Sequence, residues 1–143
     1  MTTVVIATPV EPELVERIRA VDDQLDVLFE PELLPQARYP TDHIGDPNWT
    51  PTAELERLVA RAEVLYGFPQ EKPAQLAWAV RHAPALRFVQ CMFAGAGQQV
   101  AAAELTAEEL QRIAFAAFTP KLLQPPGLDH AVFFQQRNER SGK

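Results

Sequence analysis

Residues 86–97 read LRFVQCMFAGAG, a short apolar run that ends in a turn with two glycines. A run of this kind is typical of a parallel strand covered on both faces, where nearly every side chain is apolar. Three earlier runs of similar character, at residues 4–7, 25–30 and 63–67, precede it, and one more follows at residues 112–118. The spacing between these runs is long enough for a helix each time, which predicts strands alternating with helices.

Helical patterns occupy the intervals between the runs. The predicted buried helix faces are Leu14, Val15, Ile18 and Val21, then Leu55, Leu58, Val59 and Ala62, then Leu76, Ala77, Val80 and Ala83. Thr106 to Glu109 has the spacing of a capping box, so a short helix is expected before the last strand. This order predicts a flavodoxin-like α/β fold, a doubly wound parallel sheet of about five strands with helices on both faces.

The alternation fails in two places. Residues 31–51 contain five prolines and neither period, so they are expected to form a long loop with Thr50 and Pro51 starting the next helix. Such a loop either covers one edge of the domain or carries function, and the first is the preferred interpretation. Beyond the last run the sequence becomes proline-rich, which predicts one domain over residues 1–119 and a divergent tail over residues 120–143.

Composition excludes several classes of partner. The formal net charge is −6 and Lys and Arg are not clustered, which argues against a nucleic-acid-binding surface. No apolar run approaches the roughly 20 residues of a membrane span, so no membrane partner is expected. The single cysteine, Cys91, cannot form an internal disulfide, which favours a reducing, cytoplasmic location.

No strong catalytic or metal-binding motif is present. Gly95-Ala96-Gly97 lacks the third glycine of a dinucleotide fingerprint and the Lys-Ser/Thr of a phosphate loop. It either lets the backbone approach a ligand or simply forms the turn after the strand. The three histidines have no metal-ligand spacing, and Cys91 is expected to be a buried, inert thiol. Phe68 is expected either to cover a ligand or to pack beneath the long loop.

Three segments at strand ends nevertheless resemble a known family. They are VVIATP, VLYGFP and A-x-x-LRFVQCMFAGAG, which end at residues 9, 69 and 97. Together they are similar to the N-terminal, substrate-binding half of the D-isomer-specific 2-hydroxyacid dehydrogenases, over about residues 3–115 of this sequence. The resemblance implies a flavodoxin-like substrate domain that binds a small 2-hydroxy or 2-oxo acid.

The resemblance also implies where that acid binds. In the family, backbone amides after the third strand help to hold the substrate carboxylate, a role that maps here to Gly67 and Phe68. The neighbouring substrate-facing turn maps to Phe93, Ala94, Gly95, Ala96 and Gly97. An acidic or amide residue of the family aligns with Gly97 without a gap and with Gln99 after a shift of two, and both alignments remain open.

The sequence departs from the family after the last strand. The family continues into an NAD-binding domain that holds the G-x-G-x-x-G loop and the catalytic Arg, Glu and His. We therefore expect a truncated relative with no catalytic residue and no cofactor of its own, NAD or NADP belonging to the full-length family. The alternative is a non-enzymatic binding or interaction module on the same scaffold.

Loss of the partner domain predicts an uncovered apolar surface on this domain. The tail supplies five large apolar residues that could fold back over it or pair with a second copy, so a homodimer is expected. They are Leu122, Leu123, Val132, Phe133 and Phe134.

Overall fold

The computed structural model describes residues 1–93, 96–117 and, for the backbone, 132–134. Ala94 and Gly95 of the predicted substrate turn lie outside these residues, as do Leu122 and Leu123 of the tail. No helix in the described part is long and apolar enough to cross a membrane.

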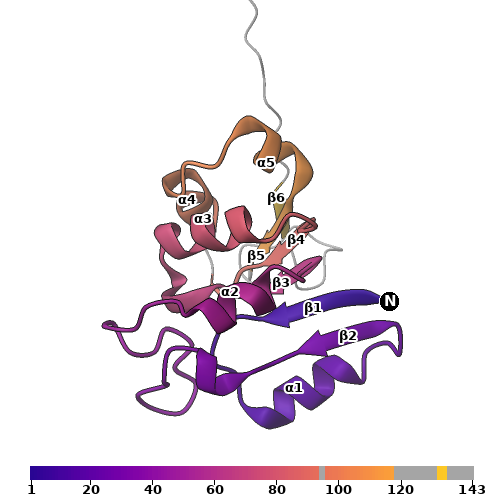
Figure 1. Ribbon diagram of the computed structural model, residues 1–143, viewed down its shortest axis with the longest axis vertical. Coiled ribbons are helices and arrows are strands. Elements are labelled where there is room, and N and C mark those ends of the chain that lie inside the picture. Colours follow the sequence, from indigo (N-terminus) through magenta and orange to yellow (C-terminus); the bar gives the residue numbers. More distant parts are fainter. Residues whose placement is uncertain (94–95, 118–131, 135–143) are drawn as a thin grey trace, which may run out of the picture.

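A sheet with five parallel strands forms the centre of the molecule (Figure 1). The strands are β1 (Thr2–Ile6), β2 (Leu25–Leu28), β3 (Val64–Tyr66), β4 (Phe88–Gln90) and β5 (Ala114–Ala117). Their order is β2-β1-β3-β4-β5, the flavodoxin-like order, so the predicted fold class is confirmed. A further strand, β6 (Val132–Phe134), pairs antiparallel with β5 and was not predicted.

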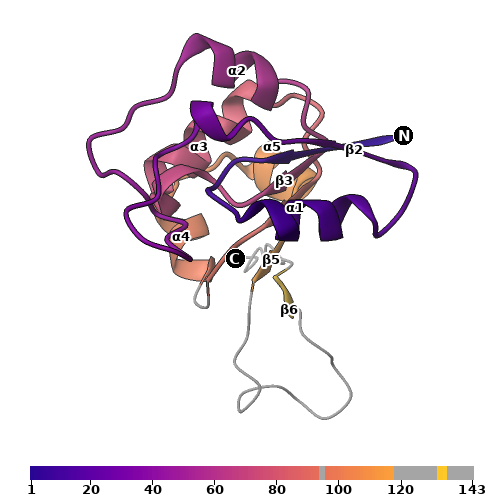
Figure 2. The same cartoon turned by 90° about the horizontal axis from the view of Figure 1, so that it is seen from below.

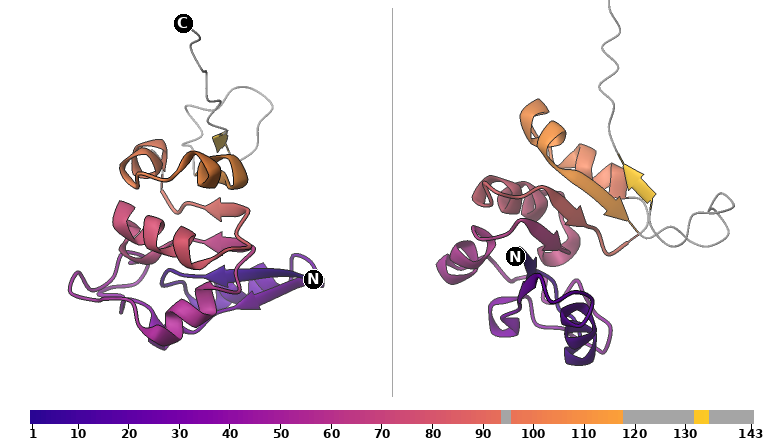
Figure 3. Two further views of the ribbon diagram at one scale, coloured as in Figure 1. Left: turned by 45° about the horizontal axis from the view of Figure 1, so that its top comes forward. Right: turned by 90° about the vertical axis from the view of Figure 1, so that its right-hand side faces the viewer.

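Helices cover both faces of the sheet, as predicted (Figures 2 and 3). The helices are α1 (Pro12–Arg19), α2 (Ala53–Val59), α3 (Pro73–His82), α4 (Ala96–Ala102) and α5 (Ala107–Arg112). Two 3-10 turns, η1 (Pro31–Leu33) and η2 (Pro69–Glu71), follow β2 and β3. Helix α1 packs through Val15 on one face, against Val4, Ile6 and Val27. The main core lies on the other face, beneath α2, α3 and α4.

Local sequence explains where these helices begin. The side chain of Thr52 caps α2 by accepting a bond from the Leu55 amide at 3.3 Å, so this helix starts after Thr52 and not at Pro51 as predicted. The predicted capping box of α5 is confirmed. Thr106 Oγ1 accepts from the Glu109 amide at 3.1 Å, and the Glu109 carboxylate accepts from the Thr106 amide at 2.8 Å.

The structure corrects two helix predictions. Leu14 and Val21 were placed on a buried face, but they are 42% and 75% exposed. Helix α1 ends at Arg19, so Val21 lies beyond its last turn. Helix α4 was missed, because its sequence AGQQVAA has a glycine near its start and too few large apolar residues to show a helical period.

The long loop between β2 and α2 crosses the carboxyl ends of β1 and β3. Thr8, directly after β1, bonds to this loop at His43, and Gln70, after β3, bonds to it at Asp46 and Trp49. Ligands of open α/β sheets bind at this edge. The loop therefore forms one wall of whatever site the fold provides.

Candidate functional site

The exits of β1 and β3 approach each other closely at Gly67. Its φ is +70°, and a Cβ atom added there would lie 2.5 Å from Thr8 Cγ2. Its amide donates to the Gln90 carbonyl at 2.8 Å, which continues the hydrogen bonding between β3 and β4. Only glycine satisfies both the backbone conformation and the contact, so this position is fixed by packing and is not a free amide donor.

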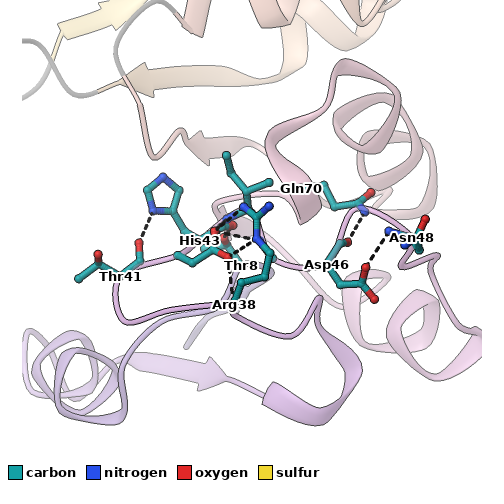
Figure 4. A network of polar contacts seen from close by, with 10 residues as sticks. Thr8, Arg38, Thr41, His43, Asp46, Asn48 and Gln70 are labelled. Carbon is teal, nitrogen blue, oxygen red and sulfur yellow. Dashed lines mark hydrogen bonds and ion pairs between the residues drawn. The ribbon is translucent and has the colours of Figure 1, made fainter.

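Strained backbone follows immediately. Gln70 and Glu71 have φ values of 57° and 50°, a region that is costly for residues with side chains. The buried Gln70 side chain holds this conformation: its Nε2 donates to the Asp46 carbonyl at 2.8 Å (Figure 4) and to the Trp49 carbonyl at 3.3 Å. Its Oε1 accepts from Gln75 Nε2 at 3.2 Å. The exit of β3 is thus tied to the long loop by a satisfied, buried amide.

A second anchor lies within the loop at Asp42, which is 3% exposed. Its carboxylate accepts from the backbone amides of Arg38, Ile44 and Gly45, and from Arg38 Nε at 2.8 Å. The Arg38 hydrogen bond, reinforced by these amides, holds the pKa of Asp42 far below its usual range. Asp42 therefore stays ionised and closes residues 38–45 into a fixed turn.

His43 joins this turn to both strand exits. Its carbonyl accepts from Thr8 Oγ1 at 2.7 Å, and its Nδ1 lies 3.2 Å from the Thr41 carbonyl (Figure 4). Its Nε2 lies 2.7 Å from Glu71 Oε1, within ion-pair distance, although this buried oxygen accepts no aligned hydrogen bond. Burial raises the pKa of Glu71, the His43 charge opposes the rise, and the nearby Asp42 adds to it. An imidazole and a carboxyl group thus lie within ion-pair distance of each other without an aligned hydrogen bond.

Two of the predicted site residues pack against each other. Phe68 is 1% exposed and its ring meets that of Phe93 edge-on, with centroids 6.0 Å apart. The contact joins the exits of β3 and β4. Of the two interpretations of Phe68, its burial favours packing, with the side chain inside the core.

The predicted glycine turn leads directly into α4. Ala96 is fully buried at the start of this helix, and a Cβ atom at Gly97 would meet nothing within 4 Å. Gly97 therefore has no steric need to be glycine in the described structure. The part of the turn formed by Ala94 and Gly95 lies outside the described residues.

Cys91 follows β4 and is fully buried. Burial, with a contribution from the charge of Glu71, raises the pKa of its thiol to about 12. The thiol is protonated at neutral pH, as an inert buried cysteine should be. Within the described residues, no cluster of three or more His, Cys, Asp and Glu side chains could hold a metal ion.

A groove of about 640 Å³ opens beside these anchors, at the carboxyl ends of β1 and β2. Polar and apolar groups contribute about equally to its walls, and the apolar part includes the aromatic residues Phe29 and Trp49. Glu32 and Asp46 also line it, whereas no Lys, Arg or His is found among its described lining residues. A smaller pocket of about 180 Å³ shares Pro9 with this groove.

Sequence reasoning missed most of the anchors, namely Thr8, Asp42, His43, Gln70 and Glu71. They form no local motif, because β1 and β3 are separated by more than fifty residues and meet only through the sheet. The available signals were the long proline-rich loop and the two strand exits. The adjacency of β1 and β3 in a flavodoxin-like sheet places both exits beneath such a loop.

Comparisons with known proteins add little to this geometry. No family model matches the chain, and no curated protein matches it. Among solved structures, the chain is similar to the crystal structure of phosphoglycerate dehydrogenase from Lactobacillus plantarum, with 19% sequence identity and a TM-score of 0.46. The match covers 83% of this chain and 29% of that one. The fold assignment rests on the order and direction of the strands themselves.

Proposed function

We propose that this chain is the substrate-binding half of a D-2-hydroxyacid dehydrogenase-like oxidoreductase, whose reaction interconverts 2-hydroxy and 2-oxo acids with NAD(P). The observation that carries the proposal is the adjacency of the β3 and β4 exits. Tyr66 pairs with Gln90 in the sheet, and Phe68 contacts Phe93 just beyond it. These are the two loops to which the family resemblance assigns the substrate.

The geometry refines the roles of the residues in those loops. The Gly67 amide is already bonded to Gln90, so Gly67 serves by allowing the close approach to Thr8. The Phe68 amide donates no hydrogen bond to another described residue, and we propose that it holds the substrate carboxylate. We propose that the half-exposed imidazole of His43, whose Nε2 lies 2.7 Å from Glu71 Oε1, supplies the positive charge that faces the acid.

Turnover requires parts that this sequence does not contain. Hydride transfer needs a bound cofactor placed against the substrate, and the sequence has no G-x-G-x-x-G loop. We propose that a cofactor domain, on the same or another chain, completes the enzyme. The purified chain mixed with NADH or NADPH and glyoxylate, pyruvate or hydroxypyruvate should show no oxidation above background, and clear turnover would overturn this part of the proposal.

Substrate binding can be tested separately from turnover. Titration with pyruvate, followed by amide NMR, should shift the signals of residues 67–71 and 91–93. Propanol, which lacks the carboxylate, should leave them unchanged. His43→Gln should weaken pyruvate binding, whereas Arg57→Gln, at an exposed site on α2, serves as the matched control. Absence of any pyruvate-dependent shift at these amides would contradict the proposed carboxylate site.

We also propose that the chain forms a homodimer through the apolar residues of its tail. Light scattering should give twice the chain mass. A monomer whose tail is rapidly cleaved after Pro120 would contradict both pairing of the tail with a second copy and packing of the tail on its own domain.

A non-enzymatic binding module on the same scaffold remains the second candidate. The specific observation that favours it is the chemistry of the groove at the β1 and β2 exits. The carboxylates of Glu32 and Asp46 in its lining would repel an anionic acid, so this groove favours a ligand other than a 2-hydroxy or 2-oxo acid.

A further inference from the structure

The groove at the β1 and β2 exits has the shape of a site for a small molecule. Phe29 follows β2 and Pro9 follows β1, and Trp49 closes the groove from the long loop. Its volume of about 640 Å³ is enough for a small organic ligand, and exposed lining residues such as Glu32 and Gln36 leave it open to solvent on one side. Phe29 and Trp49 offer contact to an aromatic or branched aliphatic body.

The charge of this groove is of one sign. Glu32 and Asp46 are the ionisable groups among its described lining residues. Asp46 Oδ1 accepts from the Asn48 amide at 2.9 Å, and neither carboxylate forms an ion pair within the described part of the chain. The pKa of Glu30, beside the groove, is raised because it shares a hydrogen bond with Glu32 and is repelled by its charge. Negative charge is therefore concentrated here, and no described cationic side chain pairs with it.

Cationic side chains near the groove are committed elsewhere. Arg38 pairs with Asp42 at 2.8 Å, and His43 lies 2.7 Å from Glu71. Redirecting Arg38 into the groove would strip the buried Asp42 carboxylate of its guanidinium partner. Among the described residues, the groove carboxylates thus have no counter-ion that the fold can release.

We propose that this groove binds a small organic cation, an amine or guanidine carried on an apolar body. The apolar body would lie between Phe29 and Trp49, and the cation would meet Glu32 and Asp46. Aromatic faces attract cations as well as burying apolar groups, so both parts of such a ligand gain from the same walls. A 2-oxo acid would be repelled by the two carboxylates.

This site is separate from the proposed carboxylate site. The groove lies at the exits of β1 and β2, whereas the acid is assigned to Phe68 and the β4 exit. The two proposals therefore fail independently. Both ligands are applied to the same sample, so that a failure of pyruvate to bind and a failure of the amine to bind are observed separately.

Three probes that share one phenylethyl body separate charge from apolar burial. They are 2-phenylethylamine, 2-phenylethanol and 3-phenylpropionate, followed by amide NMR of residues 29–36 and 46–49. Intrinsic fluorescence of Trp49 in a Trp78→Phe background gives a second readout. The amine should bind about tenfold more tightly than the alcohol, and the acid should bind least. Raising the ionic strength should remove the advantage of the amine and leave binding of the alcohol unchanged.

Variants locate the charge. Glu32→Gln with Asp46→Asn keeps an oxygen at each position, including the acceptor for the Asn48 amide, and should reduce the affinity for the amine to that for the alcohol. Glu54→Gln, an exposed carboxylate on α2 outside the groove, should change nothing. The proposal is overturned if amine and alcohol bind equally to the native chain, if the acid binds best, or if the amine shifts amides elsewhere. Should the double variant not fold, the salt dependence in the native chain decides the same question.

Discussion

The exit of β3 and the groove beside it share one edge of the sheet, yet their polar groups are arranged in opposite ways. Where β1 and β3 end, Thr8 and Gln70 make their side-chain hydrogen bonds to the chain's own loop. In the groove, Glu32 and Asp46 are left without cationic partners among the described residues. Internal pairing fixes a backbone, whereas unpaired charge in a cavity is available to a ligand. The first region therefore gives a rigid frame to the proposed carboxylate site, whereas the second offers unpaired charge to a ligand.

Substitution of Gly67 should have the largest effect on this contrast. Gly67→Ala places a Cβ atom 2.5 Å from Thr8 Cγ2 at a φ of +70°. Backbone strain and overpacking together should lower the free energy of unfolding by roughly 3 kcal/mol, measured by urea denaturation. Gly97→Ala is the matched control, because it meets open space in α4 and should be neutral or stabilise by up to about 1 kcal/mol. Equal effects at both glycines would show that the β3 exit is not tightly packed.

Removal of the Thr8 hydroxyl should have the next largest effect. Thr8→Val keeps the shape but leaves the His43 carbonyl without its 2.7 Å donor, which should cost about 1–3 kcal/mol. Thr8→Ser retains the hydroxyl and should cost less, about the loss of one buried methyl group. Thermal unfolding of the two variants gives the comparison. A serine variant less stable than the valine variant would mean that packing, not the hydrogen bond, fixes this contact.

Asp42 should make stability depend on pH in a defined direction. Its folded-state pKa is lowered, so its contribution is present above the ordinary carboxyl pKa of about 4 and is lost as the pH falls toward the folded value. Asp42→Asn should lower the urea midpoint at neutral pH, and the gap from the native chain should narrow below about pH 4. Asp23→Asn, at an exposed turn, should leave the midpoint close to that of the native chain at each pH. A gap that widens in acid would contradict the assigned role.

Glu71 should show the opposite slope and the smallest effect. Burial raises its pKa, so the folded state holds its proton more tightly than the unfolded chain does. Its contribution is favourable below the ordinary carboxyl pKa and is lost as the pH rises through the folded value. Glu71→Gln should therefore change the free energy of unfolding by less than about 1 kcal/mol at pH 7. As the pH falls, the native chain should become more stable relative to the variant. The same denaturation series as for Asp42 measures this, and slopes of the same sign at both residues would contradict it.

The sequence predicted the strands better than the site, for a physical reason. Apolar runs such as LRFVQ indicate strands that are buried in a sheet, because the hydrophobicity of a run can be read from the local sequence alone. Helix α4 has little apolar period and was missed, while α1 was made too long because Val21 happened to continue its spacing. The contact between His43 and Glu71 joins residues 28 positions apart through a loop of irregular structure. Periodicity carries no information about such a contact.

The glycines show the same limit. Gly67 and Gly97 look equivalent in the sequence, and both were assigned to the substrate loops. The structure gives Gly67 a positive φ and a tight contact, whereas Gly97 lies within a helix with open space beside it. Only the packing of β1 against β3 distinguishes them.

A single NMR titration tests the contrast between the two regions most directly. Pyruvate is added to the labelled chain, and 2-phenylethylamine is then added to the same sample. Pyruvate should shift amides of residues 67–71 and 91–93, and the amine should shift residues 29–36 and 46–49, with little overlap between the sets. If both ligands shift the same amides, or if neither set of amides shifts, the division of this edge into an anchored carboxylate site and an acidic groove is contradicted.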